Sequence, residues 1–141
     1  MRAGPGKTVR HQYVSLHVHL VWAVNQRQPL VSVEVQAWMW PLLAQKARDL
    51  GSQFVVVGGV EDHVHVLTEL PATVSVAELV RRLKGASSKI ASDRGLPELS
   101  WQEGYAAFTV SRGAREALAM YIRNQANHHA NKTLDTEAEL P

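Results

Sequence analysis

The sequence predicts an α+β fold of the ferredoxin-like type, with the order β-α-β-β-α-β, both helices on one face of the sheet, and one further helix at the end. Two observations carry this prediction. Hydrophobic residues alternate with a period of two at residues 13–24 and 60–70, and residues 54–57 and 105–110 read as two further short strands. Apolar residues recur three and four apart in the segments between and after them. The size agrees, because 141 residues with 45% hydrophobic and 20% charged residues are typical of one globular domain.

The first expected strand, residues 13–24, has one apolar face, formed by Val14, Leu16, Val18, Leu20, Trp22 and Val24. The histidines at 17 and 19 lie on the other face. After a loop at residues 25–29, Ser32 can cap a helix that Gly51 ends. Pro41 should kink this helix or mark its real start. Its apolar stripe is Val35, Trp38, Met39, Leu42, Leu43, Ala47 and Leu50.

Residues 54–57 and 60–70 are the next expected strands, with Gly58 and Gly59 as the turn between them. Pro71 stops the second of these strands, and Ser75 caps another helix. Residues 105–110 read as a fourth strand and residues 112–131 as the final helix. We expect residues 1–12 to be a flexible basic tail, residues 13–132 a single domain, and residues 133–141 an acidic tail.

The composition excludes some classes of protein and leaves others open. No apolar run approaches the roughly 20 residues that cross a bilayer, and the N-terminus lacks the hydrophobic core of a signal peptide. We therefore expect a cytoplasmic protein without a membrane partner. The net charge of +2 and the pI of about 9.2 are compatible with a nucleic-acid partner but do not require one.

The tripeptide histidine-valine-histidine occurs twice, as His17 to His19 and as His63 to His65. Residues two apart in a strand point the same way, with side-chain roots about 6–7 Å apart, so either pair could share one metal ion. In the ferredoxin-like order the first and third strands are neighbours. All four histidines should therefore gather on the sheet face that the two helices leave open. A catalytic metal usually needs a third protein ligand, which must come from elsewhere.

The final helix offers candidates for a third ligand and for a nucleophile. Tyr121 and Gln125 are four residues apart and share a helix face, with His128 and His129 one turn further on. A tyrosine beside a metal ion can attack phosphorus once a neighbour removes its proton. The alternative is an amphipathic helix that packs Leu118, Ile122 and Ala126 and uses Tyr121 as a half-buried interface residue.

These segments resemble a known family. "DHVHVL", from Asp62, resembles the HUH motif, which is two histidines around a bulky hydrophobic residue, and "YIRNQANHH", from Tyr121, resembles a nucleophile helix. "HLVW", "LKGASSKI" and "WQEGYAAFTVS" agree, in the same order along the chain. Together they are similar to the HUH single-tyrosine transposases of small bacterial insertion sequences (the insertion-sequence two-hundred group), which include the REP-associated tyrosine transposases.

The resemblance implies an enzyme and assigns its residues. His63, His65 and Gln125 would bind Mg²⁺ or Mn²⁺, and Tyr121 would be the catalytic nucleophile. The substrate would be single-stranded DNA with hairpins at the element ends, cleaved and rejoined through a 5′-phosphotyrosine intermediate. The resemblance also implies a homodimer with composite active sites, acting at the bacterial nucleoid. The expected strand order, independently of the resemblance, places His17 and His19 beside these ligands. There they would support the site through hydrogen bonds or phosphate contact, or be structural only.

Basic residues suggest where DNA would bind. On the second helix Arg81, Lys84 and Ser88 share one edge and Arg82 and Lys89 another, although a plain solvated face is the alternative. Arg123, with Arg112 and Arg115, flanks Tyr121 and could hold phosphate, although plain solvation is the alternative for each of them.

Two features depart from the family pattern. The loop "AVNQRQP" keeps only Arg27 of a usually basic cluster, and the C-terminus is short. One alternative is a domesticated or inactive relative that only binds DNA hairpins. Another is a two-histidine phosphoesterase, but that class places Ser or Thr two residues after each histidine, where this chain has histidine.

Overall fold

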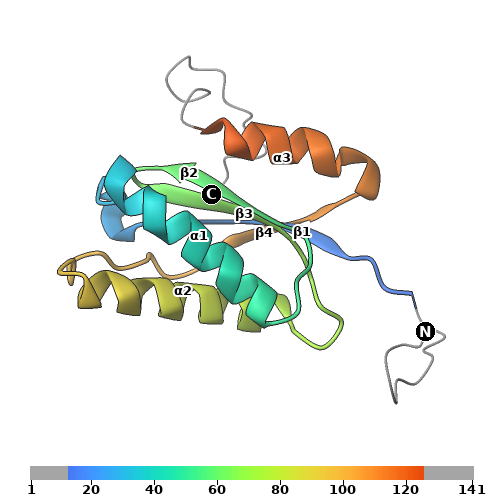
Figure 1. Cartoon of the computed structure of the whole chain (residues 1–141), viewed down its shortest axis with the longest axis horizontal. Coiled ribbons are helices and arrows are strands. Elements are labelled where there is room, and N and C mark those ends of the chain that lie inside the picture. Colours follow the sequence, from blue (N-terminus) through green and yellow to red (C-terminus); the bar gives the residue numbers. More distant parts are fainter. Residues whose placement is uncertain (1–12, 126–141) are drawn as a thin grey trace.

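A computed structural model describes residues 13–125 of the chain. Four strands, β1 (His17–Ala23), β2 (Val55–Val60), β3 (His63–Glu69) and β4 (Ala106–Val110), form one antiparallel sheet in the order β2-β3-β1-β4. The helices α1 (Val33–Asp49) and α2 (Val76–Asp93) cover one face, and α3 (Arg115–Arg123) lies across the other (Figure 1). The short 3-10 turns η1 (Asn25–Arg27) and η2 (Arg112–Ala114) complete the set. The predicted ferredoxin-like α+β fold is confirmed.

The hydrophobic core has a large part and a small part. The large part lies between the sheet and α1 and α2, where strand residues such as Leu20, Trp22 and Val66 pack against Met39 and Leu83. The small part lies under α3 and consists of Val56, Leu67, Ala119 and Ile122. Successive residues of β1 and β3 therefore point alternately toward α1 and α2 on one face of the sheet and toward the α3 side on the other.

Both predicted helix caps are present. The Ser32 hydroxyl accepts a hydrogen bond from the amide of Val35 at 3.3 Å, and the Ser75 hydroxyl accepts one from Glu78 at 3.0 Å. Pro41 lies inside α1 and does not mark its start. None of the helices in the described part of the chain is long and apolar enough to span a membrane.

Three predicted boundaries are wrong. Gly58 and Gly59 lie within β2, and the chain turns at Glu61 and Asp62. The first strand begins at His17, where its partners Glu69 of β3 and Val110 of β4 both end, so Val14 and Leu16 before it are 44% and 49% exposed. The last helix begins at Arg115, after η2. The predicted tails, and His128 and His129, lie outside the described residues.

Candidate active site

Four histidines line the sheet face beneath α3, as the sequence predicts. His17 and His19 of β1 and His63 and His65 of β3 are each at most 6% exposed. In the register between the two strands, Val21 faces His65 and Ala23 faces His63, so the two pairs are staggered along the sheet. The expectation of an open face is wrong, because α3 and its apolar residues cover this part of the sheet.

His19 and His65 form a direct hydrogen bond. Nε2 of His19 lies 2.9 Å from Nδ1 of His65, and the two rings stack with centroids 5.1 Å apart at an angle of 19°. Two neutral imidazoles can hold this contact only if one of the two nitrogens carries the proton and the other accepts it. If Nδ1 of His65 is the donor, the opposite nitrogen of His65, Nε2, is the one suited to bind a metal.

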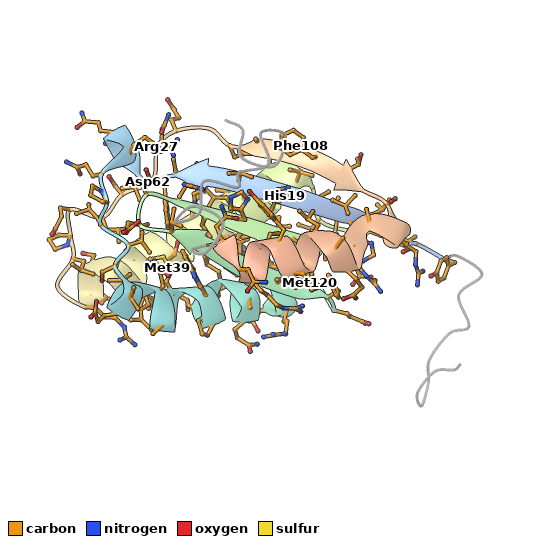
Figure 2. All side chains as sticks on the ribbon, turned by 90° about the horizontal axis from the view of Figure 1, so that it is seen from above. His19, Arg27, Met39, Asp62, Phe108 and Met120 are labelled. Atoms are coloured by element: carbon orange, nitrogen blue, oxygen red, sulfur yellow. The ribbon has the colours of Figure 1, made fainter. Side chains whose placement is uncertain are left out.

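Asp62 holds His63 in a similar way. Nδ1 of His63 is 2.7 Å from Oδ1 of Asp62, and Arg27 lies 3.3 Å from the other oxygen of that carboxylate. Burial alone would raise the pKa of Asp62, but the hydrogen bonds from His63 and Arg27 outweigh it and hold that pKa below its ordinary value of 3.8. Figure 2 shows Arg27 and Asp62 together, toward the end of the sheet away from the start of α3.

Sequence reasoning did not single out Asp62, and it noted Arg27 only as the one basic residue that its loop retains. The available signal was the position of Asp62 directly before His63. A carboxylate that accepts from Nδ1 of a histidine fixes the ring and its tautomer, which is a common arrangement beside metal ligands.

The α3 helix brings Tyr121 to the histidines. Its ring meets the ring of His65 edge to face, with centroids 6.5 Å apart at 86°. Gly58 explains how α3 comes so near, because this residue pairs with His65 across β2 and β3 and lies directly under the carbonyl of Ile122. A Cβ atom at Gly58 would lie 2.2 Å from that oxygen. Only glycine therefore allows α3 this close to the strand.

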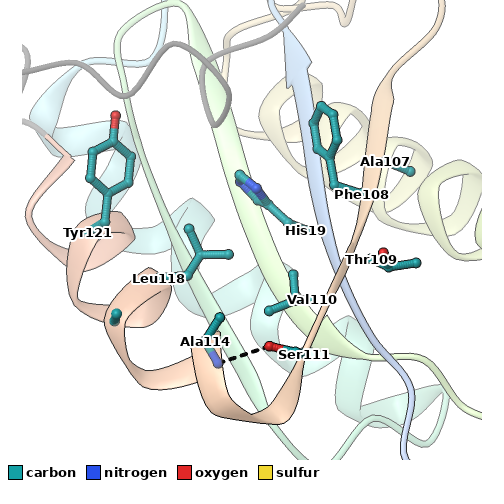
Figure 3. Close-up of a pocket in the computed structure, with 10 residues that line it drawn as sticks. His19, Ala107, Phe108, Thr109, Val110, Ser111, Ala114, Leu118 and Tyr121 are labelled. Carbon is teal, nitrogen blue, oxygen red and sulfur yellow. Dashed lines mark hydrogen bonds between the residues drawn. The ribbon is translucent and has the colours of Figure 1, made fainter.

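A cavity of about 860 Å³ opens beside Tyr121, between α3 and β4. His19 of β1, Phe108 of β4, and Leu118 and Tyr121 of α3 line it (Figure 3). Gln125, one turn beyond Tyr121, is 1% exposed. The nucleophile predicted from the sequence therefore stands at the edge of a space large enough for part of a polymer, next to the histidines.

The histidine pair of β3 fits a metal ion by its chemistry. The rings of His63 and His65 have centroids 5.1 Å apart at 68°, and in both rings Nδ1 contacts a neighbouring side chain, which directs metal binding to Nε2. Within residues 13–125, no three histidine, aspartate or glutamate side chains are grouped to hold a metal ion. Further ligands would have to come from an amide oxygen such as that of Gln125, from substrate or from water.

Two of the predicted site residues, His17 and Arg123, are not among the described side chains that surround His63, His65 and Tyr121. His17 instead lies 3.2 Å from Arg115 and packs edge to face on Phe54. Burial, reinforced by Arg115, lowers the pKa of His17 below its ordinary value of 6.5. Arg123 is exposed on α3.

The predicted DNA-contact residues of α2 lie on the opposite face of the sheet (Figure 1). Glu78 pairs with Arg81 at 2.7 Å and with Arg82 at 3.7 Å, and Asp93 pairs with Lys89 at 3.2 Å. Lys84 donates to two backbone carbonyls of the loop before β4, and burial lowers its pKa. Ser88 contacts the carbonyl of Gly85 at 3.4 Å. The structure does not bring these residues to the histidine site.

Comparison with known proteins places the chain among transposases. A family model described as "Transposase IS200 like" matches residues 12–125. The ISDra2 transposase TnpA of Deinococcus radiodurans is 27% identical over an alignment of 133 residues, and the match covers 89% of this chain and 91% of that protein.

Solved structures similar to this chain include the following two. One, from Deinococcus radiodurans R1 and described as a transposase, has a TM-score of 0.65 and 28% identity, covering 84% of this chain and 97% of that one. The other is a REP-associated tyrosine transposase bound to a REP hairpin, with a TM-score of 0.59 and 18% identity, covering 86% of this chain and 73% of that one. At 18% identity, the similarity to the REP-associated transposase shows a shared fold only.

Proposed function

The chain belongs to the IS200-like family of transposases, and on that premise we propose that it cleaves and rejoins single-stranded DNA at hairpin-bearing element ends through a 5′-phosphotyrosine on Tyr121. The observation that carries the proposal is the position of Tyr121, edge to face on His65, in a site where Asp62 and His19 hold the two histidines of the HUH motif. The ISDra2 relative, which is a transposase, and the hairpin-bound structural neighbour support a DNA substrate.

The proposed reaction exchanges one phosphodiester bond for another. The hydroxyl of Tyr121 loses its proton and attacks phosphorus, so that a bond from its oxygen to phosphorus forms and the bond to the 3′ oxygen breaks. The leaving oxygen takes up a proton and becomes a 3′-hydroxyl, which later reverses the attack. Because each step conserves the phosphate ester, strand transfer needs no external energy source.

The side chains around Tyr121 have separate roles in this proposal. His63, His65 and Gln125 would hold Mg²⁺ or Mn²⁺, which when bound neutralises phosphate charge and polarises the breaking bond. Asp62 orients His63, and His19 orients His65, since each contacts Nδ1 of its partner. The packing of α3 on Gly58 then fixes the place of Tyr121 relative to both rings.

Two further elements of the proposal concern partners. The exposed cations of α2 and Arg123 would contact DNA outside the active site. Those that are paired with a carboxylate, such as Arg81 with Glu78 and Lys89 with Asp93, would give up that ion pair for a phosphate. We also propose a homodimer with composite active sites, in which an edge strand of each sheet is available for pairing. The chain would act in the cytoplasm, at the nucleoid.

The first experiment looks for the covalent intermediate. The purified protein is incubated with Mg²⁺ or Mn²⁺ and a single strand that carries the hairpin from its own element end, and the products are separated under denaturing conditions. The wild-type protein should retain the DNA fragment. Tyr121→Phe should lose this adduct and still bind DNA, whereas the matched control Tyr105→Phe should keep it.

An adduct that persists in Tyr121→Phe would overturn the mechanism. Hairpin binding without an adduct in the wild-type protein would instead identify a relative that binds hairpins and does not cut. The two-histidine phosphoesterase alternative is disfavoured, because that mechanism has no role for Tyr121 and the family match lies elsewhere.

A further inference from the structure

Two arginines, Arg112 of η2 and Arg115 at the start of α3, differ from the cations of α2 in how they are held. Arg81, Arg82 and Lys89 are paired with carboxylates of their own helix. Within the described residues, Arg112 contacts no carboxylate, and the nearest one to Arg115 is that of Glu116, 3.9 Å away. Both arginines lie on the α3 face of the sheet, the same face as the four histidines.

Neutral groups hold these two guanidinium groups in place. Arg112 donates to the hydroxyl of Tyr13 and lies 3.4 Å from the hydroxyl of Ser15. Arg115 lies over the ring of Phe54, 4.5 Å from its centroid, and donates to Nε2 of His17 at 3.2 Å. The side chains are therefore ordered before any ligand arrives, while most of their ten N–H groups make no hydrogen bond within the described residues.

The two arginines line one cavity of about 310 Å³, together with Tyr13, Ser15, His17 and Gln53. Glu69 also lines it, and its carboxylate accepts the amide proton of Gln53 at 2.9 Å. The wall thus carries two fixed positive charges against one negative charge. Such a wall suits a single anionic group, and a guanidinium fork binds phosphate oxygens in pairs.

His17 adds a further donor. Because Arg115 can only donate, Nε2 of His17 must accept, and the neutral ring then carries its proton on Nδ1. This nitrogen is buried and has no hydrogen-bond partner in the part of the chain that the structure describes. Burial and Arg115 lower the pKa of His17, which keeps the ring in this neutral form.

We propose that Arg112 and Arg115 form a second phosphate-binding site, which holds a backbone phosphate of the single-stranded DNA near the one that Tyr121 attacks. The proposal rests on the proposed function, since that function supplies the strand. Arg115 and Tyr121 are six residues apart on α3, about 9 Å along the helix axis. His17 follows the same face of β1 as His19, about 6–7 Å away. The strand would lie along α3, with one phosphate fixed at its N-terminal end and another presented to Tyr121.

The test measures binding and its salt dependence, and it needs no cleavage. A fluorescein-labelled oligothymidine is titrated with the full-length protein at a series of salt concentrations, and the logarithm of the binding constant is plotted against that of the salt. Each phosphate contact on a single strand contributes about 0.7 to the slope. Arg112→Gln should therefore lower the slope, and Arg112→Gln with Arg115→Gln should lower it by about 0.7. Because both arginines hold the same phosphate, their effects should not be additive.

Matched variants separate this site from general electrostatics and from misfolding. Arg48→Gln removes one exposed charge from α1, on the other face of the sheet, and should leave the slope near the wild-type value. Arg112→Lys with Arg115→Lys should restore most of the slope. Arg112→Gln alone carries the test if loss of Arg115 disturbs the docking of α3, because Arg112 precedes that helix and is exposed.

A slope for Arg112→Gln equal to that of Arg48→Gln would overturn the site. No binding of oligothymidine by the wild-type protein at low salt would also overturn it, because a backbone contact does not depend on sequence. The outcome is separate from that of the cleavage experiment. A protein that forms no adduct but shows the predicted slopes would refute the proposed reaction and support the phosphate site. A protein that forms the adduct but shows no change of slope in Arg112→Gln would support the reaction and refute the phosphate site.

Discussion

The replacement of Gly58 by alanine tests whether the packing of α3 on the sheet sets the position of Tyr121. A Cβ atom at this position would lie 2.2 Å from the carbonyl oxygen of Ile122 and 2.9 Å from its Cγ2 atom. Contacts with a Cβ atom ordinarily begin at 3.4 Å, so the helix must retreat by about 1 Å. Tyr121 precedes Ile122 on the same turn and has to move with it. A displacement of about 1 Å costs about 100-fold in rate where geometry controls the reaction.

The overpacking should also lower the free energy of unfolding by about 1–3 kcal/mol. The two effects are separated by measuring single-turnover cleavage of the hairpin-bearing strand well below the unfolding temperature of the variant. Gly85→Ala is the matched control. A Cβ atom at Gly85 meets no atom within 4 Å, so this change in α2 should leave cleavage unaltered and stabilise the helix by up to about 1 kcal/mol.

Cleavage by Gly58→Ala at the wild-type rate would refute the reasoning. It would mean that the contact between Gly58 and Ile122 does not decide where Tyr121 stands. A large loss of rate in Gly85→Ala would refute it as well, because the effect would then follow any added methyl group.

Three further predictions concern the histidines. Asp62→Ala should weaken Mn²⁺ binding about 10- to 100-fold in a calorimetric titration, because His63 loses the group that orients it, and unchanged affinity would show that Asp62 has no such role. The double variant His17→Ala with His19→Ala should lower cleavage and still bind Mn²⁺, whereas complete loss of metal binding would make His19 a ligand. The lowered pKa of His17 means that the folded state binds this proton less readily than the unfolded state, so the free energy of unfolding should fall as the pH drops below 6.5. His17→Gln should flatten that part of the pH profile in denaturant titrations, and an identical profile would contradict the assigned cause.

The sequence is sufficient to predict the gathering of the four histidines. Alternation in β1 and β3 fixes the face of each side chain, and the ferredoxin-like order makes the two strands neighbours. The same alternation predicts which apolar residues of β1 and β3 face α1 and α2. It does not predict that α3 buries the histidines, because the apolar stripe of this helix is short: Ala119 and Ile122 are buried, and Leu118 and Tyr121 pack beside them only partly buried.

Gly58 and Gly59 misled the prediction for a physical reason. Two adjacent glycines are a common turn signal, but glycine also occurs where another backbone approaches closely. At Gly58 the approaching backbone belongs to Ile122, more than sixty residues later, and no local pattern records that contact. At Gly59 it is the backbone of His63 in the neighbouring strand β3.

Charge pairing on α2 could have been foreseen. Glu78 stands three and four residues before Arg81 and Arg82, and Asp93 stands four after Lys89, which are the spacings at which helix side chains meet. The contacts of Arg115 with His17 and Phe54 were not predictable, since they join three separate elements.

The most direct measurement of the central claim is the position of the covalent link in the protein. The DNA-bound wild-type protein is digested with protease and nuclease, and the peptide that keeps a nucleotide is sequenced by mass spectrometry. The chain has three tyrosines. We predict a nucleotide joined through its 5′-phosphate to Tyr121. A nucleotide on Tyr13, on Tyr105 or on any other side chain would contradict the proposed reaction.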